Sequence, residues 1–271
     1  MKKLIINADD LGYTKEINRA IIDSFKKGVV TSTSIMANMN SFSDAVKLCK
    51  KNPELDVGIH LNITTGKPVL NPNQVKSLVY RKGNFLLIPT FIKLFLGAIN
   101  LDEVEKEFNA QIKKLISNGI KPTHLDSHHH LFHIFPGILN RTIKLMKIYN
   151  IKWLRVPDEE LHSNYYNIQF LNKIGLSFFS IPVRKKLTKN NLRHTEKFFG
   201  LLHEKNVSMK SFKKIINSLS NKGVNELCCH PGYEDVDGLY RKKELKILTS
   251  KIFRGYIKEK NIELVNFRTL K

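Results

Sequence analysis

Cysteine is scarce in this sequence, and the few cysteines present form no recognisable framework. There are three in 271 residues, and Cys228 and Cys229 are adjacent. Neither a disulfide scaffold nor a Cys-x-x-Cys zinc pattern is therefore indicated. We interpret Cys228 and Cys229 as small residues in or beside a buried strand, where free thiols are common.

Long hydrophobic runs are also missing. No stretch of about 18 apolar residues occurs, so the sequence predicts no transmembrane span. The N-terminus has two lysines followed by a three-residue apolar run, Leu4-Ile5-Ile6. That run is too short for the core of a signal peptide. We therefore expect a cytoplasmic protein, with peripheral association with a membrane left open.

Acidic residues are few, with 24 Asp and Glu against 45 Lys and Arg and a formal net charge of +21. A basic surface attracts nucleic acids, anionic lipid head groups or acidic glycans. The excess is mostly lysine spread along the chain, without an arginine-rich block or an aromatic-interleaved motif, so no specific nucleic-acid partner is predicted. A lysine-favouring genome would give the same composition without any function. The functional alternative, which follows from the charge together with the apolar patch from Phe85 to Leu96, is a lipid-linked or anionic substrate.

Strand-like and helix-like segments alternate along the chain, which predicts an α/β fold with a largely parallel sheet. Predicted strands are residues 3–7, 30–36, 56–63, 122–126, 151–156, 226–229 and 262–267; predicted helices are residues 17–27, 42–50, 102–118, 138–149, 212–221 and 242–260. Residues 64–97 and 157–207 interrupt the alternation and are expected to be lids, substrate walls or plain insertions. Since no linker or repeat is visible, we expect one domain over residues 1–271.

Side chains that can bind a metal or transfer a proton fall at the ends of five predicted strands. These residues are Asp9 and Asp10, His60, the histidine block at 124–130, Arg155 and His230. In parallel α/β folds the carboxyl ends of strands meet at one face, so we predict one shared site. Taken singly, the aspartates could be turn residues and His60 a hydrogen-bonded core histidine.

The histidine block gives the most specific signal, because residues 123–133 contain five histidines and one aspartate. Histidine is the commonest metal ligand. Alternate side chains of an extended segment share a face, so we expect His124, Asp126 and His128 to point into one pocket. We interpret His133 as a surface residue at a helix start. A site of Asp and His ligands leaves metal coordination positions open and suits amide or ester hydrolysis.

Five motifs occur along the chain in this order: NADDLG at residues 7–12, GVVTSTS at 28–34, GIHLNIT at 58–64, KPTHLDSHHH at 121–130 and CHP at 229–231. Together they resemble the motifs of the YdjC-type carbohydrate deacetylases. The resemblance implies a distorted, TIM-like (β/α) barrel related to the polysaccharide deacetylases. It also implies that the chain removes an acetyl group from an N-acetylated sugar, such as an N-acetylglucosamine oligosaccharide, glycan or glycolipid.

The resemblance further implies one divalent metal ion, held by Asp10, His60 and His128. The family suggests Mg²⁺, whereas two histidines and one aspartate would suit Zn²⁺ on ligand preference. Which of the two is bound is left open.

Three catalytic roles also follow from the resemblance. Asp9 would be the general base, His230 the general acid, and Arg155 would orient Asp9. One departure concerns His133, which lies one residue further from the histidine triplet than family members often have it, so we assign it no role.

Several alternatives are left open by the sequence. The chain could be another metal-dependent amidohydrolase or a glycosidase-like hydrolase on the same barrel, or a non-enzymatic basic protein that binds a surface. Substrate-binding residues are not predicted, although Trp153, Tyr165, Tyr166 and Tyr233 are candidate platforms for a sugar ring or, equally, packing residues. A homodimer is a further expectation that the sequence does not decide.

Overall fold

A computed structural model describes residues 1–158, 180–200 and 207–270 of the chain. Its centre is a sheet of eight strands in the order β5-β4-β3-β2-β1-β7-β6, with β8 beside β1. The strands are β1 (Lys2–Leu11), β2 (Ser32–Ile35), β3 (Asp56–Leu61), β4 (His124–Ser127), β5 (Trp153–Leu154), β6 (Lys197–Phe199), β7 (Val224–Cys229) and β8 (Ile262–Leu264). All the strand pairs are parallel.

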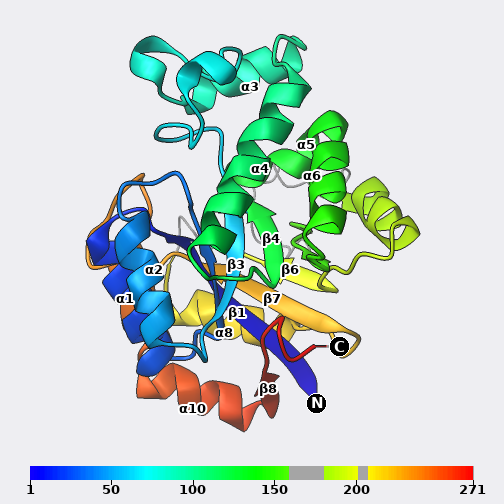
Figure 1. The fold of residues 1–271 in the computed structure, drawn as a ribbon. Helices are drawn as coiled ribbons and strands as arrows, with labels where there is room; N and C mark the ends of the chain where they lie inside the picture. The colour runs from blue at the N-terminus through cyan, green and yellow to red at the C-terminus, as the bar shows by residue number, and fades with distance from the viewer. Residues whose placement is uncertain (159–179, 201–206, 271) are drawn as a thin grey trace.

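Helices pack around this sheet (Figure 1). They are α1 (Lys15–Lys26), α2 (Phe42–Lys51), α3 (Leu87–Phe95), α4 (Leu101–Ser117), α5 (Leu131–Ile134), α6 (Pro136–Ile148), α8 (Met209–Ser218), α9 (Arg241–Leu248) and α10 (Lys251–Glu259). Short 3₁₀ turns are η1 (Pro72–Gln74), η2 (Arg81–Gly83) and η3 (His128–His130). Within the described residues no helix is both long and apolar enough to cross a membrane.

The sheet curls into an incomplete barrel. Arg193, which precedes β6, forms an isolated parallel bridge with Trp153 of β5, so the two edge strands of the sheet approach each other. β1 lies in the middle, pairing with β2 through its carboxyl half and with β8 through its first residues. The predicted α/β fold with a distorted barrel is therefore confirmed.

The helices form because their apolar residues recur at helical spacing. In α4, Val104, Phe108, Ile112 and Leu115 are fully buried, and the Asn100 side chain caps the helix by accepting a hydrogen bond from the next turn. The predicted helix at 242–260 is in fact two helices. Ser250 separates them, because its hydroxyl caps the start of α10.

The two stretches expected to be irregular contain regular elements. Residues 64–97 include α3, and residues 157–207 include β6 and the helical residues 180–189. β6 has only three residues, too few for a period to be recognised. α3 lacks the usual polar outer face, which is why its sequence does not predict a surface helix.

Candidate active site

Asp9 and Asp10 lie at the carboxyl end of β1, which extends further than the predicted strand of residues 3–7. The register between β1 and β2 shifts after Ala8, and Asp10 has a φ of 70°, in the left-handed region. Neighbouring side chains on a regular strand point to opposite faces. This irregularity lets both carboxylates approach His60, from which Asp9 and Asp10 lie 3.9 and 3.6 Å away.

Three side-chain atoms that can bind a metal lie close together, and one of them is Oδ1 of Asp10. This oxygen lies 3.4 Å from Nδ1 of His128 and 3.6 Å from Nε2 of His60. The two ring nitrogens are 3.2 Å apart. Three ligands about 2.0–2.2 Å from one ion, at angles between 90° and 110°, would be separated by roughly 2.8–3.6 Å. Asp10, His60 and His128 are thus arranged as a metal-binding group.

The chemistry of the donors supports the same assignment. Oδ1 of Asp10 is buried and has no hydrogen-bond partner among the described residues. Burial alone would raise the pKa of Asp10, but Arg241 and His128 hold it well below its usual value, so the carboxylate is charged. A buried, ionised oxygen without a donor is expected where a cation binds. The residues therefore fit a divalent ion.

Asp126 orients His60. Its Oδ1 lies 2.7 Å from Nδ1 of His60, and its Oδ2 accepts a hydrogen bond of 2.7 Å from the Ser34 hydroxyl. When Nδ1 carries the proton that binds Asp126, the lone pair of Nε2 faces Asp10 and His128. Carboxylate–histidine pairs of this kind fix the tautomer of a metal ligand.

Arg155 holds Asp9 in place by binding both of its carboxylate oxygens. Its two terminal nitrogens donate to both oxygens of Asp9 at 2.5 and 2.7 Å, and its Nε donates to Glu226 at 2.7 Å. It also lies 2.8 Å from Asp126. Burial would raise the pKa of Asp9, but Arg155 outweighs this effect and keeps the pKa far below its ordinary value. One buried guanidinium thus organises three carboxylates.

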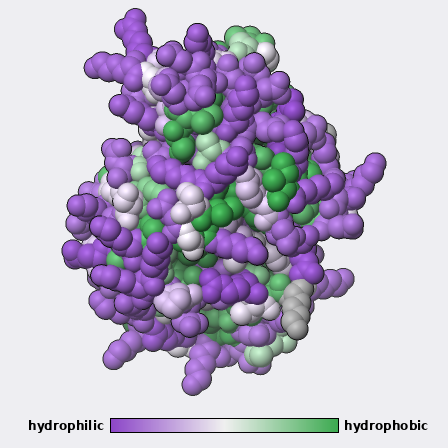
Figure 2. All heavy atoms as spheres, viewed as in Figure 1, coloured by the Kyte–Doolittle hydropathy of each residue, from purple (hydrophilic) through white to green (hydrophobic). Residues whose placement is uncertain are grey.

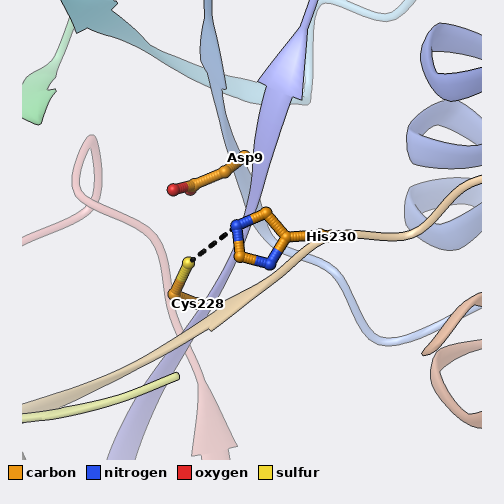
Figure 3. Close-up of side chains that lie close together, drawn as sticks. All are labelled: Asp9, Cys228 and His230. Carbon is orange, nitrogen blue, oxygen red and sulfur yellow. Dashed lines mark hydrogen bonds between the residues drawn. The ribbon is translucent and has the colours of Figure 1, made fainter. Parts of the chain in front are cut away.

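His230 follows β7, and its ring lies beside Asp9 and Cys228 (Figure 3). Its Nε2 lies 3.9 Å from the Cys228 sulfur, and its backbone N–H donates to Glu244 at 2.6 Å. Burial lowers the pKa of the imidazole to about 4, despite the nearby Asp10 and Asp9. His230 is therefore neutral at pH 7.

These side chains face one cavity of about 620 Å³. Asp9, Asp10, His60, His128 and His230 all line it. Arg155 lies behind the lining and reaches the cavity only through Asp9. The sequence-predicted site residues are thus brought together at one face of the sheet.

Comparison with known proteins gives the family. A family model described as YdjC-like protein matches residues 3–259. The chain belongs to the YdjC-like family. A carbohydrate deacetylase of Clostridium beijerinckii is 36% identical, over 99% of this chain and all of the relative, and one of Brevibacillus brevis is 34% identical over 99% of each.

The YdjC-like fold is also present in a solved structure. A crystal structure from Enterococcus faecalis V583, of a protein proposed to cleave cellobiose phosphate, superposes with a TM-score of 0.79 at 29% identity. The alignment covers 99% of this chain and 98% of that one. The predicted resemblance to the YdjC-type proteins is confirmed over the full length.

Some predictions within the histidine block of this YdjC-like protein were wrong. Of the three side chains expected in one pocket, only His128 lines the cavity. Asp126 lies behind His60, and His124 lies deeper in the barrel, 3.1 Å from the Ser34 hydroxyl and stacked on Phe267. His128 stands at the start of η3 rather than on the strand. His133 is buried instead of exposed, with its Nε2 3.0 Å from the carbonyl oxygen of Arg155.

Two candidate sugar platforms, Trp153 and Tyr233, do not line the cavity that contains Asp10, His60 and His128. Trp153 packs on Phe267 and faces a different cavity, at the amino ends of the strands. Tyr233 is exposed, and its hydroxyl bonds Asp23 on the outer surface. Tyr165 and Tyr166 lie outside the described residues.

Arg241, Glu226 and Glu244 are site residues that the sequence did not reveal. Arg241, the first residue of α9, lies 2.6 Å from Oδ2 of Asp10 and is 1% exposed. Its position 231 residues after Asp10 in the chain gives no pattern to recognise. Glu226 is the one charged residue of β7, and its part in the site is visible only from its contact with Arg155.

Metal binding by this YdjC-like protein is expected to release a proton. Burial alone would lower the pKa of His60, but Asp126, Asp9 and Asp10 raise it to about 9. A histidine must lose a proton before it can bind a metal, so binding at pH 7 should release about one proton, and affinity should rise with pH up to about 9. Calorimetric titration in buffers of different ionisation enthalpy measures this number; no released proton would contradict the assignment of His60.

Proposed function

We propose that this carbohydrate deacetylase uses one divalent metal ion to hydrolyse the acetamido group of an N-acetylated sugar. The observation that carries the proposal is the convergence of Asp10, His60 and His128 beside Asp9 and His230 in one cavity. The full-length relatives named carbohydrate deacetylases support the acetyl chemistry. The cavity volume of about 620 Å³ is within the usual range for small-molecule sites.

The metal would be Mg²⁺ or Zn²⁺. A bound divalent ion polarises an amide carbonyl and lowers the pKa of water. Oxygen-rich sites favour Mg²⁺, whereas two imidazoles favour Zn²⁺ or a similar transition metal. Metal analysis of the purified protein decides between them.

Asp9 and His230 would move the protons. Asp9 is held as a carboxylate by Arg155 and would act as the general base toward water. His230 is neutral at pH 7, so it must first take up a proton before it can donate one to the leaving amine. Its Nδ1 has no hydrogen-bond partner among the described residues and is free to do so. Arg155 would act by orienting Asp9.

Acetate release from N-acetylglucosamine oligomers tests this proposal. The holoenzyme should release acetate, lose the activity on chelation and regain it when Mg²⁺ or Zn²⁺ is added back. Failure to release acetate from any N-acetylated glycan, with metal present, would overturn the proposal. Acetate-free cleavage of glycosidic bonds without a metal would indicate a glycosidase, which needs two acids across the bond.

The other classes make different predictions. A different amidohydrolase on the same barrel would need the metal but would leave N-acetylated sugars intact. A basic surface-binding protein would bind its partner with steep salt dependence, and that binding would survive His60→Ala and His128→Ala. The cytoplasmic location, the homodimer, and a lipid-linked or anionic form of the substrate remain predictions from the sequence.

A further inference from the structure

Helix α3 presents an apolar face to solvent. Ile88, Ile92 and Phe95 follow one another at helical spacing and are 71%, 53% and 70% exposed. Leu86, Leu87 and Leu96, at the two ends of the helix, are also exposed. Figure 2 shows green, apolar side chains at the top edge of the molecule, where Figure 1 places α3. Contiguous apolar surface of this kind usually marks a binding site.

Helix α3 is held to the protein by both polar and apolar residues. Thr90 is fully buried, and its hydroxyl donates to the carbonyl of Ile63 at 3.4 Å. On the next turn the Lys93 amine donates to the carbonyl of Ser77 at 3.0 Å and lies over the Tyr80 ring. Phe91 and Leu94 pack against the hydrophobic core. The opposite side of α3 is also apolar, whereas an ordinary surface helix turns polar residues to solvent.

The exposed face forms a groove that continues into the metal cavity. The groove is lined by Leu87, Ile88, Phe91, Ile92, Phe95 and His129. Leu87 and His129 also line the cavity that contains Asp10, His60 and His128. His129 is the chain neighbour of a proposed metal ligand, so the groove begins beside the reacting centre.

Phe135 supports the groove from behind. Its ring lies 5.9 Å from the ring of Phe91 and 5.0 Å from that of Phe95, measured between centroids. Phe135 immediately precedes α6 and follows the histidine block. The groove is therefore supported by the same segment that positions His128. None of the six residues that line the groove is an aspartate, glutamate, lysine or arginine.

We propose that this groove binds the apolar part of the substrate, an alkyl or acyl chain attached to the N-acetylated sugar whose acetyl group is removed. The proposal rests on the proposed function. Because the groove and the cavity share the lining residues Leu87 and His129, a chain bonded to a sugar in the cavity can extend directly onto α3. This continuity favours the substrate over a protein or a second copy of this chain as the occupant of the groove.

Alkyl glycosides of N-acetylglucosamine, used below the concentration at which they form micelles, test the proposal. A fully buried methylene improves binding about fourfold. For a groove open on one side we expect about twofold per methylene, so the KM of the octyl glycoside should be roughly 100-fold lower than that of the methyl glycoside, which has seven fewer carbons. Calorimetry with octyl glycoside gives a second readout that does not depend on activity.

The double variant Ile92→Ser, Phe95→Ser should remove most of this preference while leaving acetate release from the methyl glycoside unchanged. Ile148→Ser and Ile252→Ser are matched controls, because these side chains are 60% and 68% exposed on α6 and α10. Both control variants should keep the wild-type ratio of KM values. Circular dichroism checks that α3 remains helical.

Three results would overturn the proposal. The first is an equal KM for methyl and octyl glycosides, which leaves the deacetylase function intact. The second is a double variant that dissociates a dimer in sedimentation experiments, which would make a second copy the occupant. The third is a double variant that loses binding to lipid vesicles but keeps the octyl preference, which would make a lipid surface the occupant. If the protein released no acetate from any of these glycosides, the proposed function itself would be contradicted.

Discussion

Asp10→Asn is expected to abolish metal binding and to lower acetate release by about a thousandfold, since a catalytic metal supplies several kcal/mol of transition-state stabilisation. The substitution keeps the size of the side chain and the oxygen that faces Arg241, 2.6 Å from Oδ2 in the wild type. It removes the negative charge beside His60 and His128. The fold should therefore persist while the ion is lost.

Inductively coupled plasma analysis of metal content and an acetate assay measure the two effects together. Asp235→Asn is the control, because Asp235 is exposed and accepts a hydrogen bond from the backbone of Lys242 through the oxygen that asparagine retains. It should keep both metal and activity. An Asp10→Asn protein that binds the ion with wild-type affinity would remove Asp10 from the ligand set.

Arg155→Met is expected to cause the largest loss of stability, about 3–5 kcal/mol, because it leaves buried carboxylates without their cation. Arg155 is 2% exposed and pairs with Asp9, Asp126 and Glu226. Methionine is apolar and fills a similar volume, so cavity formation contributes little. The melting temperature should fall by roughly 10 °C.

The pH dependence of this loss has a definite sign. Burial already raises the pKa of Glu226 to about 7 with Arg155 present. Without Arg155, the pKa of Asp9 loses the effect that lowers it and the pKa of Glu226 rises further above its unfolded value, so the folded variant gains stability as pH falls. The deficit relative to wild type should thus be smaller at pH 5 than at pH 8.

Arg141→Met is the matched control for calorimetric melting curves. Arg141 also contacts two acids, Asp102 and Glu105, but at the surface, where ion pairs contribute at most about 1 kcal/mol. It should change the melting temperature little. Equal losses in the two variants would show that burial of the carboxylates around Arg155 does not govern stability.

Strand-end residues could be predicted from the sequence because parallel strands place their carboxyl ends at one face. That rule predicts that five residues lie close together, and each of them lines the same cavity: Asp9, Asp10, His60, His128 and His230. Arg155 was found for the same reason. The resemblance to the YdjC-type proteins then separated the ligands from the residues proposed to move protons.

Other features depend on tertiary contacts that no local pattern records. Arg241 begins a helix near the end of the chain and reaches Asp10 because α9 packs against α1, the helix that follows β1. His133 appeared to be a surface residue, yet its ring binds the backbone of Arg155 inside the protein. Trp153 was considered as a sugar platform, but the direction of β5 places it at the far end of the barrel from the metal ligands.

The apolar surface of α3 could be predicted only in part. The sequence shows an apolar patch at residues 85–96, but helical spacing of apolar residues ordinarily indicates the side of a helix that faces the core. The structure shows that Phe91 and Leu94 pack on the core while the other apolar residues of α3 face solvent. That exposed surface is the basis for the proposed binding groove.

Anomalous diffraction from crystals soaked in Zn²⁺ or Mn²⁺ tests the central claim most directly. The described residues contain three groups that could hold an ion: Asp10 with His60 and His128, Asp9 with Cys228 and His230, and Asp9 with His60 and Asp126. One peak per chain is expected, about 2.0–2.2 Å from Asp10 Oδ1, His60 Nε2 and His128 Nδ1. A peak at either of the other two groups, with none at the first, would contradict the account.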